Sequence, residues 1–222
     1  VSSAASDVYK RQVKRNYPDV ELIKPKMSIY DMAIKTHLLP TRRIRWCCAK
    51  FKEMSGAGKV TLIGIRHAES ARRSKREEIE ISNHKFSGNF DQFSEHKEQM
   101  VTCVGGKDKI LVSPIIHWTD RDVWDFLNGN KIEHCSLYDE GYKRIGCILC
   151  PMSSYKDKRK DCQRFPHVKH KWIQTIQKMI DAGYINHNFT DAEFGFNWWI
   201  SDKRFEQYYA EEVLQQKIEF NV

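Results

Sequence analysis

Trp46-Cys47-Cys48-Ala49-Lys50 and Gly146-Cys147-Ile148-Leu149-Cys150 are the two stretches around which we expect this chain to be organised. Together they contain four of the seven cysteines in the sequence. The other three, Cys103, Cys135 and Cys162, have no partner at a spacing typical of a metal or redox site. We therefore predict that the two stretches, about a hundred residues apart, meet in the folded chain and hold one inorganic group.

The adjacent pair of cysteines bears on which group the thiolates would bind. Consecutive side chains on a helix leave the axis about 100° apart, which is awkward for two thiolates that bind one ion. A [4Fe-4S] cluster removes the difficulty because each thiolate can bind a different iron atom. We predict a cluster bound by Cys47, Cys48, Cys147 and Cys150, with an all-cysteine zinc site as the alternative. Buried cysteines that bind nothing are the remaining interpretation.

The composition is that of a globular protein with an anionic partner. Apolar residues make up 41% of the 222 residues, and no apolar run approaches the length of a membrane span, so we expect no membrane partner. The net charge of +8 and a pI of about 9.1 favour a nucleotide, a nucleic acid or an anionic surface as ligand. An odd number of cysteines without an apolar leader indicates a reducing, cytoplasmic location.

The apolar pattern predicts an α/β domain followed by helices. Residues 60–65 and 110–116 are apolar runs typical of strands in a parallel sheet, and residues 20–23 form a shorter run of the same kind. Residues 72–99 are highly charged, and we predict a surface loop there. Arg66 follows the first of these strands, at the edge where open α/β sheets bind ligands.

Helix signals fill the remaining segments. Ser28 is a predicted N-cap of a helix that ends by Pro40, residues 43–54 form a second helix, and Thr119 with Asp122 begins a third that runs to residue 127. Apolar residues recur at helical spacing from Val168 to Ile180 and again from Phe205 to Val213. We divide the chain into a non-native or disordered leader (1–12), a partial α/β domain (13–151) and a helical C-terminal extension (152–222).

Three segments occur in an order that indicates a family: Pro40-Thr41-Arg42-Arg43-Ile44-Arg45-Trp46-Cys47-Cys48, Leu62-Ile63-Gly64-Ile65-Arg66-His67-Ala68-Glu69-Ser70 and Gly141-Tyr142-Lys143-Arg144-Ile145-Gly146-Cys147. From about residue 25 to residue 151 the chain resembles the phosphoadenosine-phosphosulfate (PAPS) reductase family. The double cysteine followed by Cys-x-x-Cys is similar to its cluster-binding branch, typified by adenylyl-sulfate reductases. The resemblance implies a Rossmann-like fold of the adenine nucleotide alpha-hydrolase type, with a mostly parallel sheet flanked by helices.

The resemblance also implies substrate-binding residues. Arg43, Arg45 and Lys52 surround the double cysteine, where cations would stabilise an anionic cluster and attract an anionic substrate. The second motif of the family, which holds the phosphosulfate end of the substrate, matches Gly64, Arg66, Ser70 and, more loosely, Arg73. No catalytic residue can be assigned from the resemblance.

Two parts of the family pattern have no counterpart in this sequence. The phosphate loop of the first strand is missing, so we interpret the chain as an N-terminally truncated member. Gly105-Gly106-Lys107-Asp108 resembles that loop but lacks its serines, and we predict a surface turn there. A nucleophilic cysteine on a C-terminal tail is also missing, because the last cysteine is Cys162.

These observations predict a protein that binds an adenylylated nucleotide (adenylyl sulfate, PAPS or ATP) beside a [4Fe-4S] cluster and acts in sulfur reduction or sulfur transfer, with a thioredoxin-like reductant or a cysteine desulfurase as partner. One alternative is an ATP-dependent sulfur-transfer enzyme of the DNA phosphorothioation or RNA thiolation type, with a cysteine desulfurase as partner. The other is a zinc-stapled basic module that binds nucleic acid, although no nucleic-acid-reading motif is present.

Overall fold

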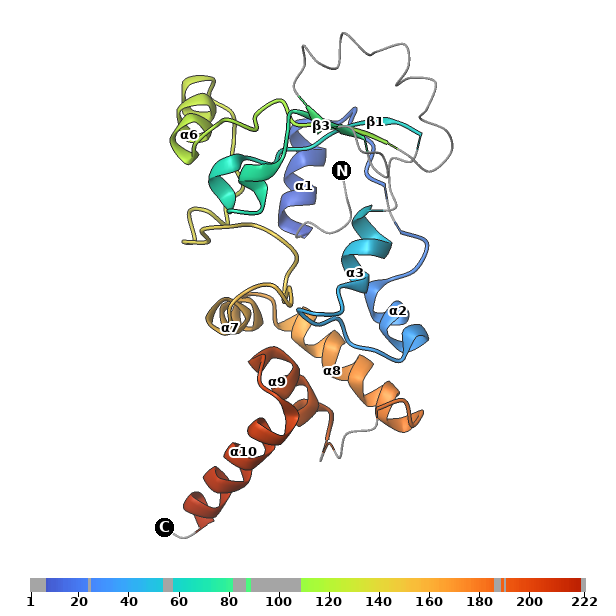
Figure 1. Ribbon diagram of the computed structural model, residues 1–222. Helices are drawn as coiled ribbons and strands as arrows, with labels where there is room; N and C mark the ends of the chain where they lie inside the picture. Colours follow the sequence, from blue (N-terminus) through green and yellow to red (C-terminus); the bar gives the residue numbers. More distant parts are fainter. Residues whose placement is uncertain are drawn as a thin grey trace. The chain divides into compact units, whose positions relative to one another are not determined.

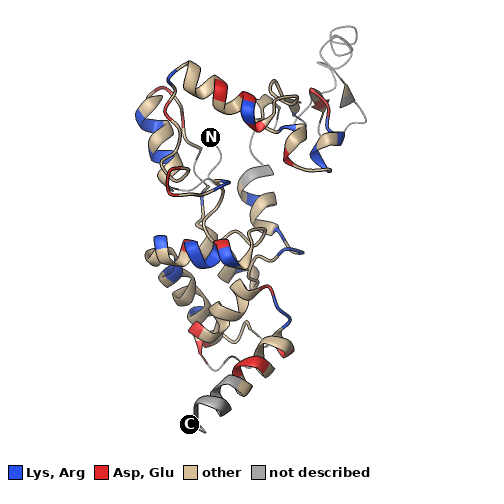
Figure 2. Ribbon diagram, turned by 90° about the vertical axis from the view of Figure 1, so that its left-hand side faces the viewer, with Lys and Arg blue, Asp and Glu red and all other residues tan. Residues whose placement is uncertain are grey.

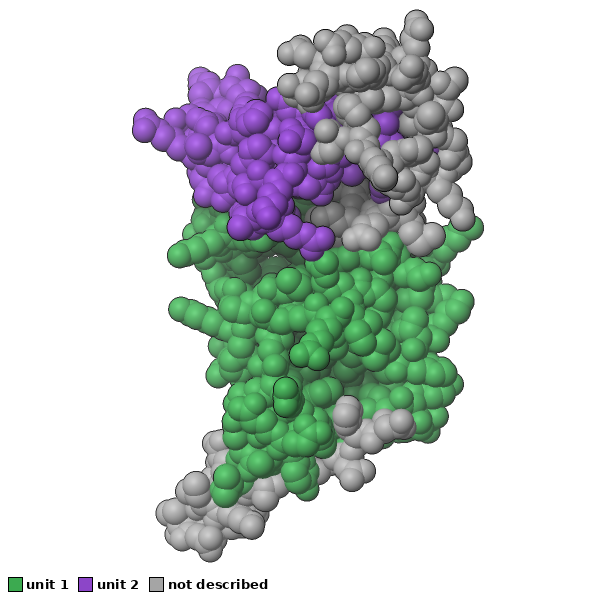
Figure 3. All heavy atoms as spheres, in the orientation of Figure 1, with its two compact units in different colours: residues 1–52, 137–222 green, residues 53–136 purple. Residues whose placement is uncertain are grey.

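The computed structural model describes residues 7–23, 25–53, 58–81, 87–88, 109–185, 189 and 191–220 (Figure 1). The chain divides into two compact units, coloured separately in Figure 3. Unit 1 contains residues 1–52 and 137–222, and unit 2 contains residues 53–136. The first unit is therefore discontinuous in sequence, because its helices come from both ends of the chain.

Unit 1 is helical in the residues described. Its elements are α1 (Asp7–Asn16), α2 (Ile29–Thr36), α3 (Trp46–Cys48), which continues as a π-helical turn η1 (Ala49–Glu53), α7 (Tyr155–Arg164), α8 (Pro166–Asp181), α9 (Ala192–Ser201) and α10 (Phe205–Phe220). Helix α1 includes residues 7–12, the second half of the predicted leader. Whether those residues are native stays a prediction.

Helix α8 is the centre of unit 1 and packs against α2 and α9 (Figure 1). Pro166 lies in the first turn of α8, where a missing N–H breaks no hydrogen bond within the helix. The buried residues of α8 recur every three or four positions. Trp172 is 3% exposed and makes ring contacts with Tyr30 of α2, at a centroid distance of 5.0 Å, and with Trp199 of α9, at 4.7 Å. Apolar burial by this one helix thus joins segments from the two ends of the sequence.

Unit 2 contains a four-stranded sheet in the order β1-β4-β2-β3. The strands are β1 (Val60–Leu62), β2 (Ile79–Ile81), β3 (Ser87–Gly88) and β4 (Ile110–Val112). Ile79, Ile81 and Ile110 form its buried cluster, against which Val112 packs. Short 3-10 turns η2 (His67–Glu69) and η3 (Arg73–Lys75) and helix α6 (Asp120–Gly129) complete the unit.

The structure confirms the mixed α/β class and most of the helix signals. Ser28 caps α2 by accepting the N–H of Asp31, and Thr119 and Asp122 form the predicted capping box of α6. Helix α2 ends at Thr36, earlier than Pro40, because His37 adopts the left-handed conformation with φ of 55°. The second predicted helix is helical from Trp46 to Glu53, and the predicted turn at Gly105 lies outside the described residues.

The sheet differs from the prediction in three respects. Only β1 and β4 pair in parallel, whereas β2 pairs antiparallel with both β4 and β3, so the described sheet is not mostly parallel. Strand β2 lies inside the segment predicted as a loop. Only Ile79 and Ile81 are buried on either side of Glu80, and so short an alternation did not predict a strand. Residues 20–23 form no strand, and Val60 and Leu62 of β1 are exposed rather than buried.

Candidate functional site

All four predicted thiolate ligands belong to unit 1. Cys47 and Cys48 lie in α3, immediately before the π-helical turn, and Cys147 and Cys150 lie in the loop that precedes α7. Within that loop Leu149 has φ of 56°, and its N–H donates to the buried carboxylate of Asp161 over 2.8 Å. The N–H of Ser153 donates to the carbonyl of Cys150 over 2.9 Å, which closes the turn.

The thiols influence one another electrostatically across the two segments. Hydrogen bonding to Cys150 and desolvation of the sulfur raise the pKa of Cys147, although the residue as a whole is exposed, and the charges of Cys150, Cys47 and Cys48 raise it further. Burial and the neighbouring Cys48 raise the pKa of Cys47 to about 11, with a further contribution from Cys150. Cys47 and Cys48 act on the pKa of Cys147, and Cys150 acts on that of Cys47, so each cysteine segment affects the ionisation of the other.

Cys150 is the thiol whose surroundings favour the thiolate. A hydrogen bond from Cys147 lowers its pKa to about 6, against the opposing effect of burial. Backbone N–H groups of Met152 and Ser153 and the charge of Arg144 also lower this pKa. Backbone N–H donors directed at a thiolate are a feature expected of a sulfur that binds a metal.

The four thiols are not arranged as a preformed site for one ion. In the described part of the chain, no group of three or more histidine, cysteine, aspartate or glutamate side chains is placed to hold a metal ion. The donor set still fits a thiolate-bound group in its chemistry, because the pKa values of the thiols depend on one another and the surroundings of Cys150 lower its pKa. Binding would require these segments to adjust.

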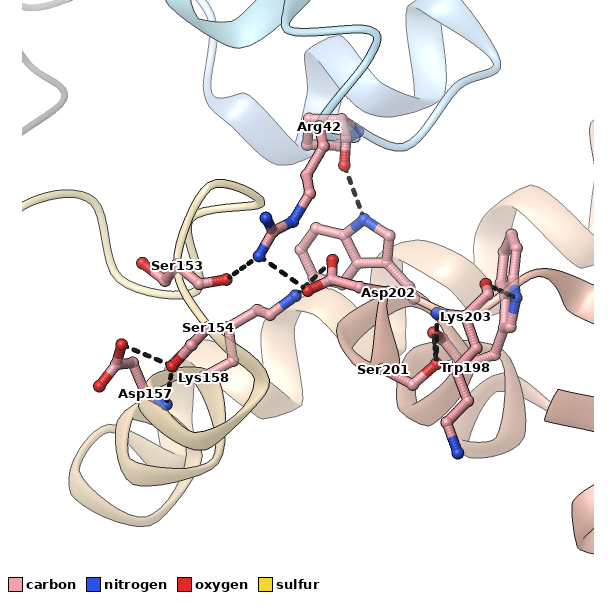
Figure 4. Close-up of polar contacts among 11 residues, drawn as sticks. Arg42, Ser153, Ser154, Asp157, Lys158, Trp198, Ser201, Asp202 and Lys203 are labelled. Carbon is pink, nitrogen blue, oxygen red and sulfur yellow. Dashed lines mark hydrogen bonds and ion pairs between the residues drawn. The ribbon is translucent and has the colours of Figure 1, made fainter. Parts of the chain in front are cut away.

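A charged network connects both cysteine segments to the C-terminal helices (Figure 4). Arg42 donates to the carbonyl of Ser153 over 3.0 Å and to Asp202 over 3.2 Å. Asp202 also lies 2.7 Å from Nζ of Lys158, which is 2% exposed. Beside this network, the indole N–H of Trp199 donates to the carbonyl of Pro40 over 2.7 Å. Residues preceding Cys47 are therefore held by Trp199 of α9 and by Asp202, whereas the loop after Cys150 is held by the guanidinium of Arg42.

The sequence did not identify Lys158 or Asp202. Lys158 is one of five basic residues of α7, a helix whose ribbon is blue at its Lys and Arg residues in Figure 2, and nothing in the sequence distinguishes the buried lysine from the others. Its burial depends on the contact with Asp202, which is distant in sequence. The Ser154 N-cap indicates where α7 begins but not which of its lysines is buried.

Among the cations predicted near the double cysteine, Arg43 and Arg45 belong to unit 1 and are exposed. Lys52 lies in the π-helical turn, and its side chain is outside the described residues. Exposed cations are available to an anionic ligand, so their position is compatible with the predicted role.

The second group of predicted site residues lies in unit 2, where the structure brings it together. Nη2 of Arg66 lies 2.7 Å from Oδ1 of Asp120 and 3.9 Å from Oε1 of Glu69. Glu69 also pairs with Arg73, and the Ser70 hydroxyl accepts the N–H of Arg73 over 3.3 Å. Gly64 is exposed and has room for a Cβ, since the nearest atom, Cδ1 of Ile115, would lie 3.9 Å away.

Helices in the described part of the chain are all too short or too polar to cross a membrane.

Several known proteins are similar to this chain. Uncharacterized protein MJ0066 of Methanocaldococcus jannaschii is 26% identical over 175 residues, which are 75% of this chain and 32% of that protein. Adenosine 5'-phosphosulfate reductase of Oceanobacillus iheyensis is 28% identical over 146 residues, 62% of this chain and 52% of that protein. Adenosine 5'-phosphosulfate reductase 1 of Bacillus subtilis is 26% identical over 153 residues, which are 65% of this chain and 56% of that protein.

This chain spans between about a third and just over half of the length of these curated relatives. No solved structure matches it. The family described as the phosphoadenosine phosphosulfate reductase domain matches residues 7–153, which include both cysteine segments and the Arg66 motif. The chain therefore belongs to the phosphoadenosine phosphosulfate reductase domain family.

Proposed function

We propose that this chain is part of an enzyme that reduces the sulfur of a sulfonucleotide, such as adenylyl sulfate, beside a [4Fe-4S] cluster. Family membership and relatives named adenosine 5'-phosphosulfate reductase support the reaction class. The single observation that supports the cluster is the mutual influence of four thiols from two distant segments of unit 1.

Cys47, Cys48, Cys147 and Cys150 would hold the cluster. When bound, the cluster supplies a fixed charge distribution that orients the anionic end of the substrate. The lowered pKa of Cys150 favours its thiolate form, so the proton of this ligand leaves more readily when iron binds. Exposed Arg43 and Arg45, together with Lys52, would attract the phosphosulfate group, because a guanidinium binds two of its oxygens at once.

Arg66 and Arg73 would bind the same kind of group in unit 2. Both currently pair with carboxylates, so an incoming phosphate or sulfate has to displace Asp120 or Glu69. The charge of Arg66 is therefore present but partly neutralised until the ligand arrives. Such competition makes the site selective for ligands that offer more than one anionic oxygen.

The proposed reaction needs two electrons. A dithiol reductant supplies them: adenylyl sulfate and two thiols give AMP, sulfite and one disulfide, as the bond between sulfur and the phosphate oxygen breaks. A thioredoxin-like protein has the required chemistry.

The cofactor is tested by anaerobic reconstitution with iron and sulfide, followed by iron and zinc analysis and a visible absorption spectrum. We expect a brown protein with about four irons per chain. Cys150→Ser should lose the iron and the visible absorption, whereas Cys162→Ser, which alters a cysteine outside the set, should retain both. A colourless wild-type protein that binds one zinc would refute the cluster.

The activity is tested with the reconstituted chain, adenylyl sulfate and thioredoxin, by measuring sulfite. Sulfite release would support reduction. Consumption of ATP with transfer of sulfur from a cysteine desulfurase to a nucleic acid, and no sulfite, would favour the sulfur-transfer alternative. DNA or RNA affinity that falls steeply with salt and ignores nucleotide would favour the zinc-stapled binding module.

A further inference from the structure

Lys158 is a buried cation in a helix whose other basic residues are largely accessible. It is 2% exposed, while its neighbours Lys156 and Arg159 on α7 are exposed. Burying an ammonium group is unfavourable unless nearby charges and acceptors replace its hydration. Lysine is rarely fully buried without a partner, so this position requires a specific explanation.

The partners of Lys158 in the described residues replace that hydration only in part. Oδ1 of Asp202 lies 2.7 Å from Nζ, and the same carboxylate is shared with Arg42. Beyond this ion pair, no acceptor is hydrogen-bonded to Nζ in the described part of the chain. An ammonium has three donors, and one carboxylate oxygen cannot satisfy them all.

Helix α7 packs the face that bears Lys158 against the cysteine loop: the carboxylate of Asp161, one turn after Lys158, accepts the N–H of Leu149, the residue before Cys150, over 2.8 Å. Burial lowers the pKa of Lys158, and the hydrogen bond and charge of Asp202 raise it. Arg42, in contrast, disfavours the ammonium. The geometry is independent of these shifts: α7 begins at Tyr155, directly after the cysteine loop, and Figure 4 shows Lys158 reaching Asp202 beside Arg42 and Ser153.

We propose that Lys158 is a positioning residue that supplies positive charge to the thiolate site, and that Asp202 holds it there. This inference rests on the proposed cluster. Four thiolates around iron form an anionic group, and a buried cation stabilises that group more than an exposed cation does, because water screens it less. Asp202 is suited to hold it because this residue ends α9 in the left-handed conformation, with φ of 62°, and receives Arg42 from the segment that precedes Cys47.

The role of Lys158 is tested with Lys158→Met, which removes the charge and keeps a long unbranched side chain. Lys156→Met is the matched control, because it makes the same change at an exposed position of the same helix. The reconstituted proteins are exposed to an iron chelator, and the loss of visible absorption is followed with time. We expect Lys158→Met to lose the cluster roughly 10-fold faster than wild type, and Lys156→Met to match wild type.

Two further measurements separate charge supply from simple packing. The cluster of Lys158→Met should have a more negative midpoint potential, because removal of a nearby cation disfavours the added electron. The metal-free variant should be at least as stable as metal-free wild type, since Met removes the desolvation of a buried charge and Arg42 remains to pair with Asp202. A packing role alone would lower the stability of the metal-free protein and leave the potential unchanged.

Asp202→Asn tests the same proposal if the Lys158→Met protein does not fold. Asparagine tolerates the left-handed conformation, so the helix end should be preserved while the carboxylate is lost. Faster loss of the cluster from Asp202→Asn supports the proposal. Equal rates and potentials in wild type and the variants would overturn it and leave the proposed function intact, whereas a wild-type chain without iron would contradict the proposed function itself.

Discussion

Asp161 illustrates, at the scale of a single residue, how the cysteine loop obtains its shape. Its carboxylate is 7% exposed and accepts the N–H of Leu149, the residue before Cys150, over 2.8 Å. Leu149 has a positive φ, which is unfavourable for a branched side chain unless the surroundings enforce it. The hydrogen bond from α7 therefore fixes the turn that presents Cys150.

The protonation of Asp161 should influence stability. Burial raises its pKa above the ordinary value of 3.8, against the opposing hydrogen bond from Leu149. The folded state consequently holds the proton more tightly than the unfolded state, so this contribution is present below pH 3.8 and is lost as pH rises through the folded pKa.

Asp161→Asn keeps an oxygen that can accept the N–H of Leu149 but cannot ionise. We expect the free energy of unfolding of the variant, relative to wild type, to increase as pH rises from below 4 towards 7. Urea unfolding of both metal-free proteins at several pH values measures this difference. A difference that is constant with pH would show that burial does not disfavour the charged carboxylate.

At the scale of the secondary-structure element, helix α6 depends on its first turn. Thr119 accepts the N–H of Asp122, and the Asp122 carboxylate accepts the N–H of Thr119 over 2.7 Å. The reciprocal pair satisfies two donors that the helix leaves without intrahelical partners. The backbone and side-chain hydrogen bonds from Thr119 lower the pKa of Asp122, so its contribution is present at neutral pH and is lost in acid.

Thr119→Ala should lower the free energy of unfolding by about 1 kcal/mol, because the N–H of Asp122 loses its acceptor. Chemical denaturation at neutral pH measures the change. Arg121→Ala is the control: it lies in the same turn and removes an ion pair between exposed side chains, Arg121 and Asp125, whose effect should be small. Equal effects of the two substitutions would contradict the importance of the cap.

The cysteine-bearing helix shows a second feature at this scale. Helix α3 continues as the π-helical turn η1 directly after Cys48. π-helical turns occur frequently at functional sites because the wider turn changes the direction of side chains. Cys47 and Cys48 therefore lie directly before a turn of this kind.

At the scale of the whole molecule, the two units should respond separately to a mutation in one core. Trp172 contacts Tyr30 and Trp199, so it joins the N-terminal and C-terminal parts of unit 1. The core of unit 2, built on Ile79, Ile81 and Ile110, is a separate cluster. Loss of Trp172 should therefore destabilise unit 1 by about 3–5 kcal/mol, through lost burial and the cavity left behind.

Amide hydrogen exchange is the appropriate measurement for Trp172→Ala. Exchange should become faster in α2, α8 and α9, while the amides of β2 and β4 keep their wild-type protection. Val112→Ala, a smaller change in unit 2, is the reciprocal control and should affect the sheet alone. Uniformly faster exchange throughout the chain after either substitution would show that the two units unfold as one.

Local signals in the sequence determined much of the helical structure and the set of thiols. The caps at Ser28 and Thr119 and the apolar stripe of α8 depend on neighbours within one or two turns, so sequence alone was sufficient to place them. The pairing of the sheet could not be placed in this way. Strand β2 has two inward-facing residues, and its antiparallel partners are chosen by contacts distant in sequence.

The residues of the candidate site also fall into those that the sequence predicted and those that only the fold revealed. Residue type and spacing selected Cys47, Cys48, Cys147 and Cys150, because their chemistry is encoded in the residues themselves. Only the tertiary structure brought Lys158 and Asp202 together with Arg42, which contacts the loop after Cys150, since a lysine on α7 becomes a buried cation through the packing of α9 and not through its own sequence neighbours. Burial is a property of the assembled fold, and no local pattern in a charged helix determines which cation is enclosed.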